Sequence, residues 1–169
     1  MQAHLSVALP DEAATLRLGG VLAAGVAPGR VLTLRGALGC GKTTLVRGLL
    51  RALGYAGRVK SPSYALVELY TFSSLNLYHF DFYRFKDPSE WMNSGFRDYF
   101  NSASACIVEW PERAKGLLAS PDIETQLAFA PVGRSATLRA HTPADPAASS
   151  HSEPPAHRRQ QKCSWPRAP

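Results

Sequence analysis

Residues Gly36-Ala37-Leu38-Gly39-Cys40-Gly41-Lys42-Thr43 match the pattern G-x-x-x-x-G-K-[ST] of a phosphate-binding P-loop. The three glycines have no Cβ, so the backbone can turn tightly and come close to an anion. Successive backbone N–H groups would then surround the phosphates. Lys42 can reach the β- and γ-phosphates of a nucleotide, and the hydroxyl of Thr43 can bind Mg²⁺. The motif therefore predicts a nucleotide site with a bound metal ion.

The residues on either side of the motif provide the context that a P-loop requires. Residues 30–35 are expected to form a short buried strand, because Val31, Leu32 and Leu34 are apolar. Residues 42–53 are expected to form a helix, because their apolar side chains recur on one face of a 3.6-residue period. Gly54 follows, where a glycine commonly ends a helix. A bound phosphate would lie at the N-terminus of this helix, where the helix dipole favours negative charge.

Two further helices are predicted from their first residues. Pro10-Asp11-Glu12 is typical of a helix start. The buried face of this helix would be formed by Leu18, Val21 and Leu22. Asp87-Pro88-Ser89-Glu90 combines an N-cap, a proline at the first helical position and a glutamate three residues after the cap. The second helix would end near Gly95.

The remaining apolar runs predict strands. Residues 64–70 and 75–82 are rich in aromatic and aliphatic residues, and the short link at 71–74 predicts that they form a β-hairpin. Three further strands are expected at 103–110, 124–129 and 136–140. This succession of elements predicts an α/β fold. We expect a P-loop NTPase-like three-layer sandwich, with a mixed sheet that contains the inserted antiparallel hairpin.

Composition divides the 169 residues into a folded part and a tail. Residues 1–140 are expected to form one P-loop domain, which is long enough to bury a core of its own. Residues 141–169 are dominated by Pro, Ala, Ser, His and Arg. Such a segment buries too little apolar surface to offset its ordering entropy, so a disordered basic tail is expected.

Whole-chain properties indicate the environment and the partners. No apolar run approaches the length of a membrane span, and the N-terminus lacks the basic and apolar segments of a signal peptide. The three cysteines are far apart and have neither a disulfide nor a zinc spacing. A cytoplasmic protein without membrane contact is therefore expected. The formal charge of +6 suits nucleotides or nucleic acids, but it also fits ordinary solvated basic residues.

Two acids at the ends of predicted strands are candidates for the chemistry. Asp81 and Glu109 each follow an apolar run, and ligands bind at the carboxyl ends of strands in such sheets. Either carboxylate could bind Mg²⁺ or orient water, or one of them could be an ordinary salt-bridge partner. His79 is expected to pack and hydrogen-bond beside the sheet. Ser61 and Ser63 lie on a proline-stiffened loop, which is either a γ-phosphate sensor or a plain turn.

Five motifs, in their order and spacing, resemble the bacterial TsaE (YjeE) family over roughly residues 5–140. They are G-x-x-G-x-G-K-T-T at 36–44, V-K-S-P-S-Y at 59–64, Y-H-F-D-F-Y-R at 78–84, G-F-R-D-Y-F at 95–100 and E-W-P-E-R at 109–113. The second motif departs from the family's usual S-P-T-[FY]-[TS]. Ser63 keeps the first hydroxyl, whereas Ala65 removes the second, which puts a switch role at position 65 in doubt.

The resemblance implies an ATPase, with weak or partner-dependent turnover, that is required to form N6-threonylcarbamoyladenosine (t6A) at position 37 of tRNAs reading A-starting codons. It implies the partner proteins TsaD and TsaB, and contact with tRNA directly or through their complex. Lys42, Asp81 and Glu109 would be catalytic. Thr43, Asp81 and Glu109 would bind Mg²⁺, and Trp110 would shape the site or a partner surface. The implied ATP-binding residues are Gly36, Ala37, Leu38, Gly39, Cys40, Gly41, Lys42, Thr43, Thr44 and Arg134.

Two other functions remain open from the sequence. A small-molecule kinase shares the P-loop and the size, but the arginine-rich lid of such kinases is missing between Glu109 and Phe129. A nucleotide-gated assembly factor with negligible turnover would need the same acids, so the sequence barely separates it from an ATPase. A regulatory GTPase is disfavoured, because the N-K-x-D motif that reads guanine does not occur.

Overall fold

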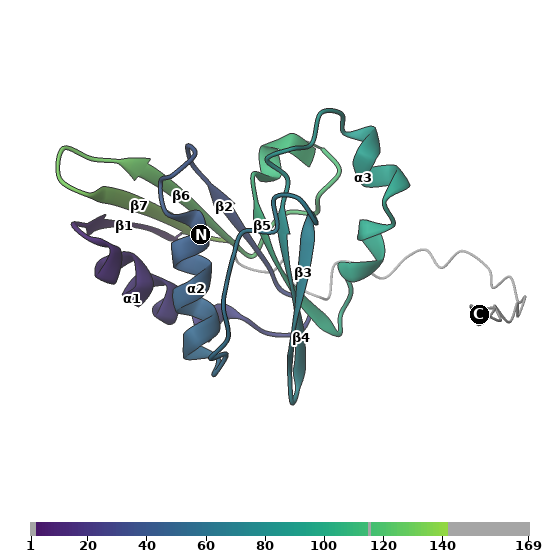
Figure 1. Cartoon of the computed structure of the whole chain (residues 1–169), viewed down its shortest axis with the longest axis horizontal. Helices are drawn as coiled ribbons and strands as arrows, with labels where there is room; N and C mark the ends of the chain where they lie inside the picture. The colour runs from purple at the N-terminus through teal and green to yellow at the C-terminus, as the bar shows by residue number, and fades with distance from the viewer. Residues whose placement is uncertain (1–2, 115, 142–169) are drawn as a thin grey trace, which may run out of the picture.

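A seven-stranded mixed sheet forms the centre of the molecule (Figure 1). The computed structural model describes residues 3–114 and 116–141, so the predicted tail lies outside the described residues except for His141. The strand order is β1-β7-β6-β2-β5-β4-β3. The strands are β1 (Ala3–Leu9), β2 (Val31–Arg35), β3 (Val67–Phe72), β4 (Leu75–Asp81), β5 (Ser104–Glu109), β6 (Ile123–Phe129) and β7 (Arg134–Ala140). β6, β2, β5 and β4 are parallel to one another. β3 pairs antiparallel with β4, β7 with β6, and β1 with β7.

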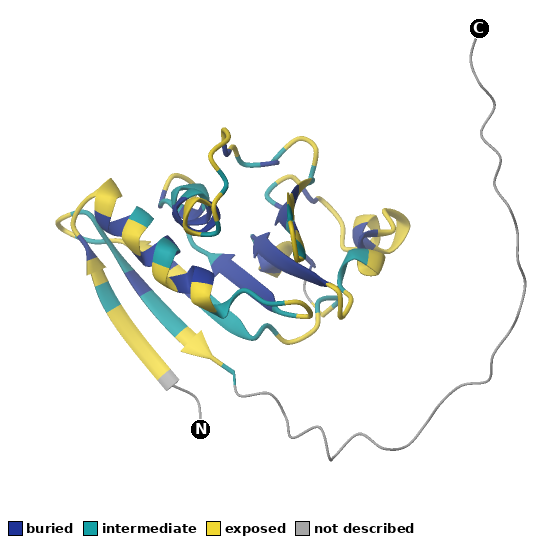
Figure 2. Cartoon of the chain, turned by 90° about the horizontal axis from the view of Figure 1, so that it is seen from below, coloured by how far each residue is buried: buried dark blue, intermediate teal, exposed yellow. Residues whose placement is uncertain are grey.

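Helices cover both faces of this sheet and complete a three-layer α/β sandwich (Figures 1 and 2). On one face, α1 (Glu12–Leu22) packs along α2 (Lys42–Ala52), and η1 (Ala23–Gly25) continues α1. On the other face lie the short helices α3 (Ser89–Asn93), η2 (Phe96–Tyr99) and η3 (Pro111–Ala114). The expected α/β sandwich is thereby confirmed. Within the described ranges, no helix has the length and apolar character needed to cross a membrane.

Two glycines allow α1 and α2 to approach each other closely. A Cβ built on Gly19 of α1 would lie 2.1 Å from the carbonyl oxygen of Leu45, and one built on Gly48 of α2 would lie 2.1 Å from that of Leu16. Because α1 turns Gly19 toward α2, Val21 is left 70% exposed, and its predicted burial is wrong. The packing of α1 holds α2, and with it the P-loop, against the sheet.

Alternation along β4 separates polar from aromatic side chains. Leu77 belongs to the core beneath α1 and α2, and His79 and Asp81 share its face because side chains alternate along a strand. Phe80 points to the opposite face, into an aromatic cluster with Phe82 of the following loop. His79 and Asp81 therefore lie on the same side of the sheet as the start of α2.

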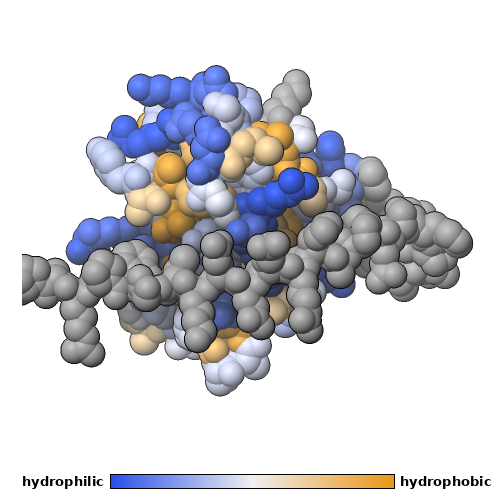
Figure 3. Space-filling view, turned by 90° about the vertical axis from the view of Figure 1, so that its right-hand side faces the viewer, coloured by the Kyte–Doolittle hydropathy of each residue, from blue (hydrophilic) through white to orange (hydrophobic). Residues whose placement is uncertain are grey.

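The aromatic cluster supports the second face of the sheet. Its rings are those of Phe80, Phe82, Phe85, Trp91 and Phe96, and neighbouring centroids lie 4.4 to 6.4 Å apart. Aromatic pairs at such separations stabilise a core beyond their buried area. Figure 3 views the molecule from the side of α3, where hydrophobic and hydrophilic residues lie interspersed on the surface.

Most predicted elements are present with shifted ends. The hairpin is confirmed, but β3 begins at Val67, and the link between the strands shortens to the two residues 73–74. The helix predicted to start at Pro88 begins at Ser89, although Asp87 Oδ1 still accepts from the backbone N–H of Ser89 at 2.7 Å. β1 was not predicted. Val7 and Leu9 share a face and pack against the core, whereas His4, Leu5 and Ser6 are exposed.

Candidate nucleotide site

The P-loop lies beside a cavity at the carboxyl ends of β2, β4 and β5. The volume of this cavity is about 430 Å³, which is within the usual range of small-molecule sites. The walls come from segments that are distant in the sequence, and most of the lining residues have a polar side chain. The lining residues are Leu38, Gly39, Gly41, Lys42, Thr43, Thr44, Ser61, Ser63, Asp81, Tyr83, Arg84, Glu109, Trp110 and Arg134.

The backbone of the P-loop has the conformation that its glycines were expected to permit. Gly36, Gly39 and Gly41 have φ angles of 139°, 77° and 105°, which residues with a Cβ rarely adopt. A Cβ on Gly36 would also lie 2.4 Å from the carbonyl oxygen of Leu127. Gly41 directly precedes α2, so the loop ends at a helix N-terminus. Free N–H groups at that terminus favour an anion.

Lys42 is buried at the start of α2 and directs its ammonium group back to the loop. Its side chain donates to the carbonyl oxygens of Gly36 at 2.7 Å and Ala37 at 3.0 Å, and it contacts Cys40 Sγ at 3.8 Å. Nζ also lies 4.1 Å from the ring centroid of Trp110, within the range of a cation–π interaction. The positive charge is therefore held between the loop and the residue that follows β5.

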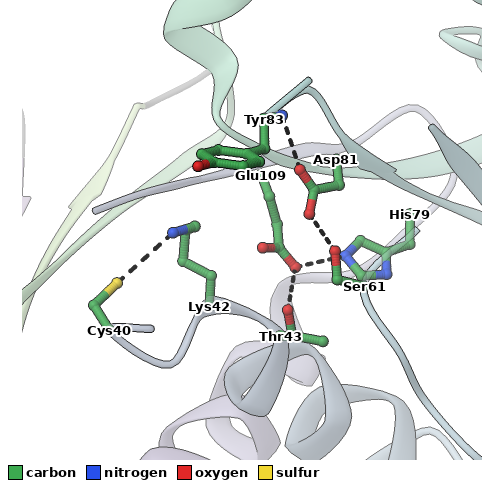
Figure 4. Close-up of polar contacts among 8 residues, drawn as sticks. All are labelled: Cys40, Lys42, Thr43, Ser61, His79, Asp81, Tyr83 and Glu109. Carbon is green, nitrogen blue, oxygen red and sulfur yellow. Dashed lines mark hydrogen bonds and ion pairs between the residues drawn. The ribbon is translucent and has the colours of Figure 1, made fainter. Parts of the chain in front are cut away.

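The first turn of α2 meets the end of β5 through Thr43 and Glu109 (Figure 4). Thr43 Oγ1 donates to Glu109 Oε1 at 3.0 Å. The same carboxylate oxygen lies 2.9 Å from Nε2 of His79. His79 thus packs and hydrogen-bonds beside the sheet, as predicted. In Figure 4 the second oxygen of Glu109 points away from this pair, to the side of Lys42.

Asp81 is held at the end of β4, next to Glu109 in the parallel register of β4 and β5. Its Oδ1 accepts from the backbone N–H of Tyr83 at 2.9 Å, and its Oδ2 accepts a short hydrogen bond from the hydroxyl of Ser61. Neither acid pairs with an arginine within residues 3–114 and 116–141. The alternative of a simple strand-end salt bridge to arginine is therefore not supported.

The oxygen donors of the cavity fit a hard cation such as Mg²⁺. Thr43 and Glu109 place a hydroxyl and a carboxylate oxygen 3.0 Å apart, and Asp81 lies beside Glu109 on the neighbouring strand. No cluster of three or more His, Cys, Asp or Glu side chains with metal-binding geometry occurs in the described part of the chain. This sparse donor set suits Mg²⁺, which proteins commonly hold through one or two carboxylates together with substrate phosphates.

Two residues from outside the P-loop border it. Arg134, at the start of β7, donates from Nη2 to the carbonyl oxygen of Gly39 at 3.3 Å. Trp110, directly after β5, has a left-handed backbone with φ of 58°. A non-glycine residue in this region carries strain of about 1–3 kcal/mol, and such strain is common at functional sites. Both residues, which the resemblance had pointed to, line the cavity.

The structure separates the predicted nucleotide contacts into two groups. Leu38, Gly39, Gly41, Lys42, Thr43, Thr44 and Arg134 line the cavity, whereas Gly36, Ala37 and Cys40 do not. The carbonyl oxygens of Gly36 and Ala37 instead bind the ammonium group of Lys42, and Cys40 is completely buried. Ser61 and Ser63 both lie at the cavity, while their role as phosphate sensors stays a prediction.

Sequence reasoning did not identify two lining residues, Tyr83 and Arg84. Both follow Asp81 closely, so their position just after a strand-end acid was the available signal. The guanidinium carbon of Arg84 lies 4.0 Å from the ring centroid of Tyr64, and this contact joins the loop after α2 to the segment after β4.

The sequence and the fold are similar to those of known proteins. A family model described as "Threonylcarbamoyl adenosine biosynthesis protein TsaE" matches residues 9–135. The tRNA threonylcarbamoyladenosine biosynthesis protein TsaE of Haemophilus influenzae is 42% identical over 139 residues, which are 79% of this chain and 88% of that protein. The protein of the same name from Bacillus subtilis is 42% identical over 101 residues, which are 60% of this chain and 61% of that protein. The crystal structure of YdiB from Bacillus subtilis superposes with a TM-score of 0.66 and 30% identity, covering 83% of this chain and 86% of that one.

Proposed function

The chain belongs to the TsaE family, and on that premise we propose that it is an ATP-binding and ATP-hydrolysing accessory protein of t6A formation in tRNA. The name of its relatives refers to threonylcarbamoyladenosine biosynthesis, which supports this pathway. The target is the adenosine at position 37 of tRNAs reading A-starting codons. The partners are TsaD and TsaB, and tRNA is contacted directly or through their complex.

One juxtaposition carries the proposal: a P-loop lysine, a helix-start hydroxyl and two strand-end acids meet at a single cavity. Lys42 and Thr43 come from the start of α2, and Asp81 and Glu109 come from the ends of β4 and β5. A nucleotide triphosphate with Mg²⁺ needs a cation for the phosphates and oxygen ligands for the metal. The cavity supplies both kinds of group.

The roles of the residues follow from where they lie. Lys42 would exchange its contacts with the carbonyl oxygens of Gly36 and Ala37 for the phosphate oxygens of ATP. Thr43, with Asp81 or Glu109, would hold Mg²⁺, which neutralises charge on the β- and γ-phosphates when it is bound. A carboxylate oxygen of Glu109 that faces the cavity would orient the attacking water.

The test is release of phosphate from ATP by the purified chain, alone and then with TsaD, TsaB and tRNA. Hydrolysis that rises on addition of the partners supports an accessory ATPase. Saturable ATP binding without hydrolysis in any mixture would favour a nucleotide-gated assembly factor. Transfer of phosphate to an added hydroxyl compound would favour a kinase, and absence of nucleotide binding would contradict all three.

A further inference from the structure

His79 is a buried polar residue whose imidazole ring has one polar partner. Nε2 lies 2.9 Å from Glu109 Oε1, while Nδ1 is buried and has no hydrogen-bond partner among the described residues. The side chain is 0% exposed, and that of Glu109 is 3% exposed. An ionised carboxylate only accepts hydrogen bonds, so in this contact Nε2 carries the hydrogen.

Stability alone does not explain a histidine at this position. Leaving Nδ1 buried without a partner costs about 1–3 kcal/mol. The surrounding core face is apolar, with Leu77 two residues earlier on β4, and Ile107 opposite His79 in the register with β5. An apolar side chain would fill the space without that cost. An apolar residue could not form the hydrogen bond to Glu109, so this bond is the property that distinguishes histidine at position 79.

The two hydrogen-bond donors to Glu109 Oε1 differ in how firmly they are held. Thr43 donates through a hydroxyl that rotates about a single bond, and in the proposed function this hydroxyl is also a metal ligand. His79 donates through an imidazole ring that is completely buried against the core face of β4. If the Thr43 hydroxyl bound a metal ion instead, His79 would remain as the donor to Glu109 Oε1.

We propose that His79 is a positioning residue for Glu109. Its Nε2–H group holds Oε1 at the strand side, so that the second oxygen of Glu109 points to the side of Lys42 (Figure 4), where it would orient the attacking water. His79 acts through Glu109 and does not contact the nucleotide. The inference rests on the proposed function, because it assigns His79 a part in the same hydrolysis.

Two amide substitutions separate the positioning role from a general need for a polar side chain. In His79→Gln the terminal amide nitrogen takes the place of Nε2, whereas in His79→Asn it takes the place of Nδ1. We expect His79→Gln to keep kcat for ATP hydrolysis within about threefold of the unmodified chain, and His79→Asn to lower it by about 10- to 100-fold, as for other residues that orient a site ligand. The KM for ATP and the thermal midpoint of His79→Asn should change little by comparison.

Each outcome of the kinetic comparison bears on a different claim. Full activity in His79→Asn, or an equal loss of kcat in both amide variants, would overturn the positioning role while leaving the ATPase assignment intact. A loss confined to the thermal midpoint would also overturn it, since that result describes a purely structural residue. An unmodified chain that is inactive with TsaD, TsaB and tRNA would contradict the proposed function itself and this inference with it.

A spectroscopic readout tests the contact independently of turnover. In protein labelled with ¹⁵N-histidine, His79 should show a slowly exchanging proton on Nε2, assigned by its disappearance in His79→Asn. In Glu109→Ala the proton should exchange faster, because its acceptor is gone. A proton found on Nδ1, or exchange that is unaffected by Glu109→Ala, would overturn the proposal.

Discussion

The hydroxyl of Thr43 donates to Oε1 of Glu109 at 3.0 Å, although 66 positions separate the two residues in the chain. The contact exists because the P-loop follows β2, and β2 pairs in parallel with β5, placing Leu34 opposite Glu109. Both residues therefore come to the same edge of the sheet. Thr43, which is expected to bind the metal, and Glu109, which is expected to orient water, are thus in direct contact.

This arrangement predicts that Glu109→Ala separates binding from turnover. Lys42 and the loop backbone remain for the phosphates, and Thr43 and Asp81 remain for the metal, so the affinity for ATP should stay within about threefold. Hydrolysis should fall by about 10²–10³-fold, the usual loss when a group that acts in the transition state is removed. Titration with a fluorescent ATP analogue and an assay of phosphate release measure the two effects.

Glu112→Ala is the matched control for this experiment. Glu112 follows closely in the chain but is partly exposed and does not line the nucleotide cavity. Its one ion pair among the described residues is a long contact of 3.7 Å with Arg35. Its loss should leave both measurements unchanged. Equal hydrolysis by the unmodified chain and by Glu109→Ala would remove Glu109 from the mechanism.

The glycines of the P-loop should differ in their sensitivity to substitution. Gly36→Ala adds a Cβ 2.4 Å from the carbonyl oxygen of Leu127, whereas Gly39→Ala adds one with no atom within 4 Å. Both positions have positive φ, so both variants carry backbone strain of about 1–3 kcal/mol, and the clash in Gly36→Ala should add about 1–3 kcal/mol to its loss. Denaturant unfolding measures the difference, and equal losses in the two variants would show that the close approach to Leu127 is not maintained in solution.

Tyr70 should ionise at an unusually high pH. Burial raises its pKa to about 12, and the charge of Glu68 and the phenol of Tyr55 add to the shift. Since the folded pKa lies above the ordinary tyrosine value of 10.0, the stabilising contribution is complete below about pH 10 and is lost as the pH rises toward about 12. Between these values the unmodified chain should lose more unfolding free energy than Tyr70→Phe. Identical pH profiles for the two proteins would contradict the burial of this phenol.

The features predicted correctly from the sequence depend on local chemistry. The glycines and lysine of the P-loop, the apolar stripe of α2 and the acids that end β4 and β5 can each be read from a few adjacent residues. Asp11 is another example, because its side chain accepts from the N–H of Ala14 at 2.7 Å and caps α1 as its sequence context indicates. In all these cases the residues that determine the feature lie within a few positions of it in the sequence.

The features that were missed depend on contacts between distant segments. The buried face of α1 is set by Gly19 and Gly48, which add no hydrophobic signal but decide how closely two helices pack. β1 pairs with β7, more than a hundred residues later, and only its last residues, Val7 and Leu9, reach the core. The link between His79 and Glu109 requires the register of β4 and β5, which the sequence does not encode locally.

The central claim is that the P-loop binds the triphosphate of ATP together with Mg²⁺, and calorimetric titration with ATP tests it most directly. Lys42→Ala removes the buried ammonium group of the loop and serves as the critical variant, while Lys86→Ala, which changes an exposed lysine outside the cavity, serves as the control. We predict saturable, Mg²⁺-dependent binding by the unmodified chain and by Lys86→Ala, and at least about a 100-fold weaker affinity in a folded Lys42→Ala variant, since charge-assisted contacts to phosphate are lost. No saturable binding by the unmodified chain, or undiminished binding by Lys42→Ala, would contradict the claim.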